Sequence, residues 1–323
     1  MTAFLGIDIA KDSFDVTLLL EPGGKHRRQF TNNATGYKQL HHWLQHHTAA
    51  LLPACMESTS CYWEDLALYL HQAGYPVSVV NPARIRGYAI SQMRRSKTDP
   101  IDADVIADFC RTQQPSSWTP PTQAQRKLRA LVRHLQALKK SRTQQSNRLA
   151  TCADSEVRAS VETILHTLES EIGRMQQRIR DFFAEHPDLS QKREWLKSIK
   201  GIGETTATHI LAEMYDLEHY ENAKAAAADA GITTSHYRSG TSVRRRSKMS
   251  RMGKAAIRAA LYFPAITAIE HNPVVKQLAK RLEAKGKLKQ VIQVAAMRKL
   301  MHLAYGVLKN KQMFDPNYAT AVG

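Results

Sequence analysis

The strongest constraint on the fold is a change of hydrophobic pattern at Pro120 and Pro121. Before these prolines, residues 4–20 show two strand-like stretches joined by a short turn, and helical and strand-like stretches then alternate. After them, strand patterns are absent as far as Pro187 and apolar residues recur at helical spacing. The sequence therefore predicts a mixed sheet packed against helices, followed by a helical half.

The expected elements follow from these patterns. Strands are expected at 4–10, 14–20, up to about 30, 51–56 and 77–80, and helices over about 36–47, 62–72 and from Asp99 onward. In the second part, Leu128, Leu131, Leu135 and Leu138 keep a heptad spacing, as do Val161, Leu168, Met175 and Phe182. This pattern predicts two long helices, either as an antiparallel coiled-coil arm or as a helical hairpin packed on its own domain. Further helices are expected over 222–230, 253–270 and 287–309.

The charge of the chain is concentrated in its second part. The 46 Lys and Arg residues exceed the 29 Asp and Glu residues, which gives a formal charge of +17. Residues 1–114 hold 11 residues of each sign, so 35 basic and 18 acidic residues remain for 115–323. Such an excess destabilises a compact state unless an anionic partner offsets it. The distribution predicts a neutral first domain joined to a half that binds nucleic acid.

Composition argues against several other classes of protein. No apolar run approaches the ~20 residues of a membrane span, and the N-terminus lacks the basic head and cleavage site of a signal peptide. We therefore expect a cytoplasmic protein without a membrane partner. The four cysteines form no CxxC pair and are too few for a disulfide framework or a zinc ribbon, so buried, reduced thiols are expected.

Two acidic residues of the first part are associated with strands. Asp8 lies in mid-strand between Ile7 and Ile9, where an ionised carboxylate is costly unless a cation or a donor meets it. Strand alternation puts Gly6 on the same face, where it would leave open space beside the carboxylate. Glu57 ends a later apolar strand, a position that can bring it beside Asp8.

Two further acidic residues, Asp99 and Asp102, stand at an expected helix start. Asp99 occupies an N-cap position before Pro100, and the i, i+3 spacing keeps Asp102 on the same side, although the same pattern is also an ordinary helix start. Asp104 is rotated by about 200° from Asp102 and points away. The four carboxylates together would offer oxygen ligands for two Mg²⁺ or Mn²⁺ ions, which can flank a phosphate.

Two segments of the second part indicate contact with nucleic acid. Lys200, Gly201 and Gly203 resemble the hairpin of a helix-hairpin-helix, whose backbone N–H groups approach a DNA phosphate, although an ordinary tight turn has the same pattern. Ser239 precedes a glycine in a basic loop that attracts phosphate; the alternative is a simple Ser-Gly turn. The basic residues that follow Ser239 are Arg244, Arg245, Arg246, Lys248, Arg251 and Lys254.

These segments resemble a known family, the DEDD transposases of the IS110 insertion sequences. Segments 6–11, 56–59, 80–82 and 97–103 are similar to its RuvC-like, RNase-H-fold half, and segments 199–203 and 237–244 are similar to its C-terminal transposase half. The resemblance covers nearly the whole chain. It implies an α/β RuvC-like catalytic domain at 1–118, a helical coiled-coil arm at 119–190 and a mainly α-helical transposase domain at 191–323.

The resemblance also implies a chemistry. Asp8, Glu57, Asp99 and Asp102 would be the metal-binding tetrad, and Ser239 the nucleophile that forms a phosphoserine link to DNA. The implied partners are donor and target DNA, a structured non-coding bridge RNA that guides the reaction, and further copies of the chain in a tetramer built from dimers. Active sites in that tetramer would combine two subunits, and the protein would act at the bacterial nucleoid.

Three other functions stay open. Residues 6–11 also resemble the opening of sugar kinases and actin-like ATPases, but the Gly-rich phosphate loops of those folds are missing here. A RuvC-like, Mg²⁺-dependent junction-resolving endonuclease would use the carboxylates with water, and a non-catalytic RNA- or DNA-binding protein would need only the basic half. Replacing Ser239 separates a recombinase from a hydrolase, and removing the acids separates either from a binding protein.

Overall fold

The computed structural model describes residues 2–48, 50–92, 99–235, 238–239, 243–244, 248–250 and 252–317. For 99–101, 234–235, 238–239, 243–244 and 248 it describes the backbone alone. The chain forms two compact units, Met1–Pro120 and Pro121–Gly323. None of the helices in these described ranges combines the length and the hydropathy that a membrane crossing needs.

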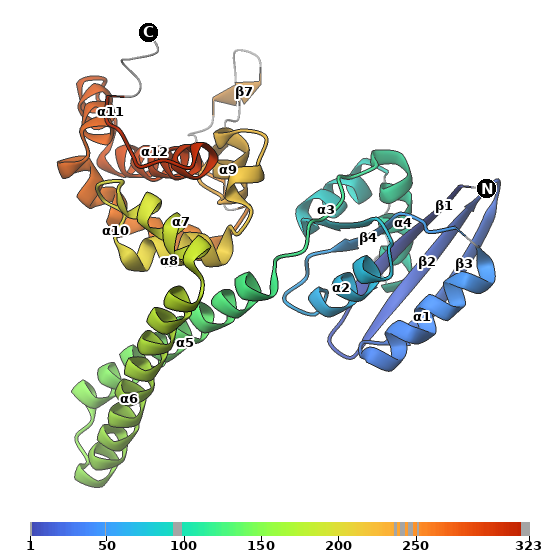
Figure 1. Ribbon diagram of the computed structural model, residues 1–323, viewed down its shortest axis with the longest axis horizontal. Coiled ribbons are helices and arrows are strands. Elements are labelled where there is room, and N and C mark those ends of the chain that lie inside the picture. The colour runs from blue at the N-terminus through green and yellow to red at the C-terminus, as the bar shows by residue number, and fades with distance from the viewer. Residues whose placement is uncertain are drawn as a thin grey trace. The chain divides into compact units, whose positions relative to one another are not determined.

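The first unit is a five-stranded mixed sheet with helices on both faces. Its strands are β1 (Thr2–Ile9), β2 (Ser13–Glu21), β3 (Gly24–Thr31), β4 (Ala54–Glu57) and β5 (Val77–Val80). They are ordered β3-β2-β1-β4-β5 (Figure 1), with β1, β2 and β3 antiparallel and β4 and β5 parallel to β1. This architecture is the expected α/β class and is consistent with an RNase-H-like domain.

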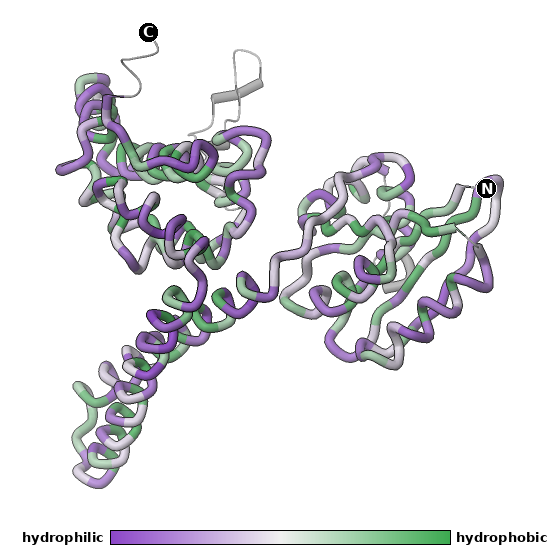
Figure 2. Tube along the Cα trace, in the orientation of Figure 1, coloured by the Kyte–Doolittle hydropathy of each residue, from purple (hydrophilic) through white to green (hydrophobic). Residues whose placement is uncertain are grey.

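Alternation along β1 divides the core of this unit between the two faces of the sheet. Leu5 and Ile7 pack with helices α1 (Ala34–His47) and α2 (Glu64–Gln72) on one face. Phe4 and Gly6 point to the other face of the sheet, which α4 (Asp99–Gln113) covers. Helix α3 (Pro82–Ser91) packs beside α4 on that face. Figure 2 shows hydrophobic residues running along the strands between these layers.

Gly6 contacts α4 instead of leaving open space, so the expectation from the sequence was wrong. A Cβ on Gly6 would lie 2.2 Å from the backbone N of Ala107 and 2.3 Å from the carbonyl O of Ala103. Only glycine allows the helix backbone to approach the strand this closely. The expectation of four buried cysteines was also wrong in part, because Cys55 and Cys110 are buried whereas Cys61 is exposed.

The second unit is built on a helical hairpin. Helices α5 (Gln123–Thr151) and α6 (Ser155–Glu185) are joined by three residues and therefore run antiparallel. Leu128 and Leu135 of α5 and Met175 and Phe182 of α6 belong to the same apolar core. The two long helices expected from the heptad spacing are thus present.

The rest of the unit packs on the base of this hairpin. Its helices are α7 (Pro187–Lys197), α8 (Glu204–Glu213), a 3-10 turn (Leu217–His219), α9 (Ala223–Asp229), α10 (Ala255–His271), α11 (Pro273–Ala284) and α12 (Lys289–Asn310). The sequence pattern did not predict α11, which begins where the buried Asn272 accepts hydrogen bonds from the N–H groups of Val274 and Val275. Two short antiparallel pairs lie between α9 and α10: β6 (Thr234–Ser235) with β9 (Lys248–Met249), and β7 (Arg238–Ser239) with β8 (Val243–Arg244).

Candidate active site and nucleic-acid interface

Asp8 and Glu57 stand at the carboxyl ends of two neighbouring parallel strands. In the ladder between β1 and β4, Gly6 is opposite Cys55 and Ile7 is opposite Met56, so Asp8 and Glu57 are the next residues along each strand. Paired positions of adjacent strands project to the same face of a sheet. The backbone therefore brings these two carboxylates to one edge and one face.

Helix α4 runs antiparallel to β1 across that face. Its middle passes over Gly6, and Cys110 near its end donates to the carbonyl O of Pro53, which precedes β4. The first turn of α4 therefore lies toward the end of β1 that carries Asp8. Asp102 belongs to this turn.

The structure leaves the shared metal site of the four acids as a prediction. Asp99 is the first residue of α4, and its side chain lies outside the described residues. Among the side chains that are described, no group of three His, Cys, Asp or Glu residues is close enough to hold a metal ion. The backbone brings Asp8, Glu57 and the start of α4 to the same edge of the sheet.

Asp15 is an acidic residue of this edge that the sequence analysis missed. It is the direct partner of Asp8 across β1 and β2 and therefore shares its face. The side-chain amide of Gln29 donates to its carboxylate at 3.0 Å. Counting residues outward from the turn, where Ile9 pairs with Phe14, would have identified this pair.

Asp104 fixes α4 to the sheet. Its buried carboxylate accepts hydrogen bonds from Thr17 Oγ1 at 2.9 Å and from Arg27 Nε at 2.9 Å, and it also pairs with Lys25. Burial alone would raise the pKa of Asp104, but the hydrogen bonds from Arg27, Lys25 and Thr17 outweigh burial and lower it below its usual value. Asp104 therefore stays ionised and serves the packing of α4.

Ser239 lies on a short strand, although the sequence pattern predicted a loop. Its backbone pairs with that of Val243, in the ladder of β7 and β8. The second ladder pairs Thr234 with Met249, nearer to the helices in sequence. The side chains of Ser239, Arg244 and Lys248, and all of Arg245, Arg246 and Arg251, lie outside the described residues.

Two glycines, Gly231 and Gly253, flank the segment that carries Ser239, residues 232–252. Gly231 and Gly253 have φ values of +68° and +126°, and a Cβ on Gly253 would lie 2.6 Å from the backbone N of Gly231. Beside them, Lys254 Nζ pairs with Asp229 at 2.9 Å, and the Lys254 N–H donates to the Asp229 carbonyl at 2.8 Å. Lys254, one of the expected nucleic-acid contacts, thus already has a carboxylate partner in its own chain.

The two glycines of the helix-hairpin-helix-like turn differ in their surroundings. Gly201 has a φ of +105°, and a Cβ there would lie 2.7 Å from the Cβ of Ala268, so this glycine is required for packing against α10. Gly203 is exposed, has open space around it and precedes the first turn of α8. Lys200 is exposed as well, while its carbonyl accepts a hydrogen bond from Asn272 at 3.1 Å.

Known proteins match the chain along almost its whole length. A protein-family model of the DEDD, IS110 type, described as a transposase, matches residues 5–156. A second protein-family model, described as Transposase IS116/IS110/IS902 family, matches residues 193–280. The pilin gene-inverting protein of Moraxella bovis is 32% identical over 319 residues, 97% of each chain, and that of Moraxella lacunata is equally similar. The transposase for insertion sequence element IS1328 of Yersinia enterocolitica is 25% identical over 264 residues, 73% of this chain and 75% of its own. The chain belongs to the IS110 family of transposases.

Proposed function

We propose that this protein cuts and rejoins DNA strands through a serine nucleophile, Ser239, and a metal-binding tetrad formed by Asp8, Glu57, Asp99 and Asp102. The observation that carries the proposal is the edge of the first unit where β1 and β4 end side by side under the first turn of α4. Relatives whose names describe gene inversion and transposition support a reaction that rearranges DNA.

The donor set fits Mg²⁺ or Mn²⁺, because both ions prefer carboxylate oxygens. Such ions, when bound, activate the attacking oxygen and stabilise the leaving oxygen of a phosphoryl transfer. The chain's own residues set the geometry: the parallel ladder fixes the spacing of Asp8 and Glu57, and the ion cluster around Asp104 holds α4 on the sheet. Asp102 is thereby kept at the same edge.

Ser239 exchanges one phosphoester bond for another. Its hydroxyl oxygen bonds to phosphorus and gives up its proton, and the bond from phosphorus to one sugar oxygen breaks as that oxygen gains a proton. A sugar hydroxyl of the second strand then reverses the exchange and frees the serine. Because one bond forms for each that breaks, rejoining needs no ATP.

The remaining parts of the proposal concern partners and layout. A RuvC-like domain at 1–118 and a transposase domain at 191–323 would be separated by a coiled-coil arm at 119–190. The 35 basic residues beyond residue 114 would bind donor DNA, target DNA and a structured bridge RNA. A tetramer built from dimers would then pair the acids of one subunit with Ser239 of another.

A nicked suicide substrate tests the nucleophile. Wild-type protein should form a DNA adduct that survives denaturation, and Ser239→Ala should not, while Ser235→Ala serves as a serine control in the neighbouring short strand. A junction-resolving hydrolase is the second candidate, favoured by the carboxylate edge alone. Release of free 3′-hydroxyl and 5′-phosphate ends without any adduct would establish hydrolysis and overturn the serine mechanism.

A further inference from the structure

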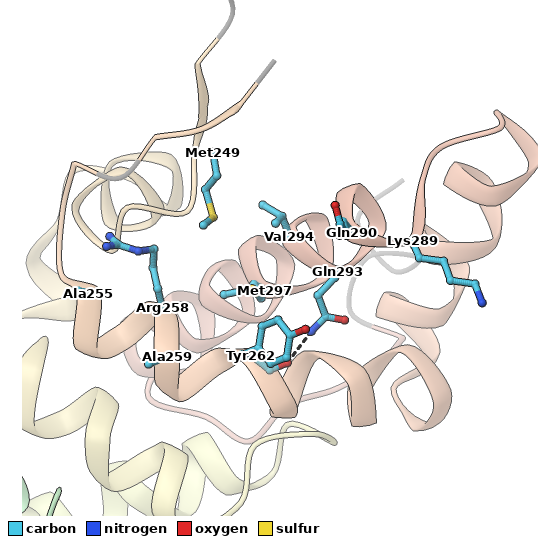
Figure 3. A pocket seen from close by; sticks show the side chains of 10 residues that line it. All are labelled: Met249, Ala255, Arg258, Ala259, Tyr262, Lys289, Gln290, Gln293, Val294 and Met297. Atoms are coloured by element: carbon cyan, nitrogen blue, oxygen red, sulfur yellow. Dashed lines mark hydrogen bonds between the residues drawn. The ribbon is translucent and has the colours of Figure 1, made fainter. Parts of the chain in front are cut away.

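A pocket opens between the first turns of α10 and the first turns of α12. It has a volume of about 650 Å³, and the side chains that line it come from one face of each helix and from Met249 of β9 (Figure 3). Ala255 and Ala259 line the α10 side, where their small side chains leave space between the helices. Met297, almost fully buried, lies on the α12 side.

The lining combines an aromatic ring, amides and cations. The ring of Tyr262 is half exposed, at 50%, and faces the pocket. Gln290 and Gln293 add two side-chain amides, and the Gln293 amide donates to the Tyr262 carbonyl. An aromatic face can stack on a nucleobase, and amide groups can bond to its donor and acceptor edge.

The charge around the pocket favours a polyanion. Arg258 and Lys289 lie among the described lining residues, and none of those residues is acidic. Residues 252–317 hold 12 Lys and Arg against 3 Asp and Glu. A second copy of this basic surface would be repelled, whereas a DNA strand would place phosphates near these two cations, which lie at opposite ends of the pocket (Figure 3), and one base against the ring.

The pocket is connected to the Ser239 segment through Arg258. Arg258 Nη1 donates to the Gly253 carbonyl at 3.2 Å, and a Cβ on Gly231 would lie 2.3 Å from Arg258 Nη1. Arg258 thus contacts both glycines that flank this segment. Met249 contributes to the pocket from the end of that segment.

We infer that this pocket holds one unpaired base of the DNA strand that the Ser239 segment engages. The inference rests on the proposed function for the identity of the strand. Extrusion of a base loses stacking and pairing within the duplex, which stacking on Tyr262 and contacts with the two amides offset. The site would therefore select DNA that is locally unpaired, with little dependence on which base is presented.

Binding by the full-length Ser239→Ala protein tests the inference without any cleavage. The probe is a DNA duplex with a short unpaired bubble that contains 2-aminopurine, compared with the fully paired duplex. We expect tighter binding and quenched fluorescence with the bubble. Tyr262→Ala should weaken bubble binding about ten-fold and abolish the quenching, whereas Tyr262→Phe should keep both.

Phe263→Ala is the matched control. Phe263 is the next residue of α10, is 73% exposed and does not line the pocket, and its ring meets the Tyr262 ring edge-on at a centroid distance of 5.3 Å. Its loss leaves the stacking face of Tyr262 in place, so the quenching should persist. As a readout that needs no variant, 5-iododeoxyuridine placed in the bubble of wild-type complexes should photo-crosslink to Tyr262, as mapped by mass spectrometry.

Four results would overturn the inference. The first two are equal affinity for the bubble and the paired duplex, and unchanged bubble affinity and quenching in the Tyr262→Ala protein. The other two are stronger quenching of 2-aminopurine in RNA of the same sequence than in DNA, and a Tyr262→Ala protein in which only the oligomeric state changes in sedimentation. The serine adduct assay reports on the proposed function separately. If the Tyr262→Ala protein forms the adduct and binds the bubble as the wild type does, the pocket is rejected and the proposed function is kept. If the wild-type protein forms no adduct but still quenches the 2-aminopurine in the bubble, the proposed function is rejected and the pocket is kept.

Discussion

Asp8 carries the sharpest prediction for a single side chain. Replacement by Asn keeps its size but removes the charge that a divalent cation requires. We expect Mg²⁺-dependent strand cleavage to fall by at least about 100-fold, since metal ions supply several kcal/mol of transition-state stabilisation. Nucleic-acid affinity should change little, because most of the basic residues are in the second part of the chain. Gel-based cleavage and binding assays measure the two effects.

Asp12→Asn is the control for this substitution. Asp12 is an exposed acid in the turn between β1 and β2, four residues beyond Asp8, and is not one of the four proposed metal ligands. Its replacement should leave cleavage intact. Normal cleavage by Asp8→Asn, or by wild-type protein in excess chelator, would reject the metal site.

His302 gives the second unit a pH dependence. Burial, together with the charges of Arg298 and Lys299, lowers the pKa of His302 from 6.5 to about 4. Between these values the unfolded chain binds a proton that the folded chain excludes, so stability is lost as the pH falls through this window and is constant above it. His302→Gln should flatten that part of the curve in urea unfolding from pH 7.5 to pH 4. The exposed His271→Gln should retain the wild-type slope, and equal slopes for both variants would contradict the assignment.

Single residues differ in how far sequence alone could identify them. Asp8 and Glu57 were identifiable because a charge inside an apolar strand, or at its end, stands out against strand alternation. Asp15 was not identified, because its place beside Asp8 depends on the register of two strands, which counting outward from their turn would have given. The role of Gly6 was misjudged because a pattern does not reveal which helix backbone passes over a strand.

The contact between β1 and α4 makes the strongest prediction for an element. Gly6→Ala would place a methyl group 2.2 Å from the Ala107 backbone N, so the helix must move. We expect a loss of about 1–3 kcal/mol in unfolding free energy, as for other overpacked cores. Cleavage should fall as well, because the turn that bears Asp102 moves with α4.

Gly173→Ala on α6 is the control. An added Cβ there meets nothing within 4 Å, so the variant should be neutral or stabilising by up to about 1 kcal/mol. Equal stability of the two variants would contradict the role of Gly6.

Elements with a long periodic pattern were predictable, and those defined by tertiary contacts were not. The hairpin of α5 and α6 follows from the heptad spacing of apolar residues. Helix α11 is an exception, because its start is local: Asn272 caps it and Pro273 is its first residue, the same pattern that predicted a helix start at Asp99 and Pro100. The ladders around Ser239 were missed because two-residue strands carry no alternation to detect.

For the molecule as a whole, the charge distribution and the two compact units lead to the same test. The boundary at Pro120 leaves 11 basic and 11 acidic residues in the first unit and the 35 basic and 18 acidic residues in the second. Each unit has its own apolar core, so the fragments 1–120 and 121–323 should both fold, as circular dichroism would verify. The second fragment should bind DNA with an affinity that falls by roughly three orders of magnitude between 50 and 200 mM salt if about six phosphates are neutralised, because each neutralised phosphate releases a counterion. The first fragment should bind weakly at every salt concentration. Similar affinities, or similar salt slopes, would show that the basic excess of the second unit is not what holds the nucleic acid.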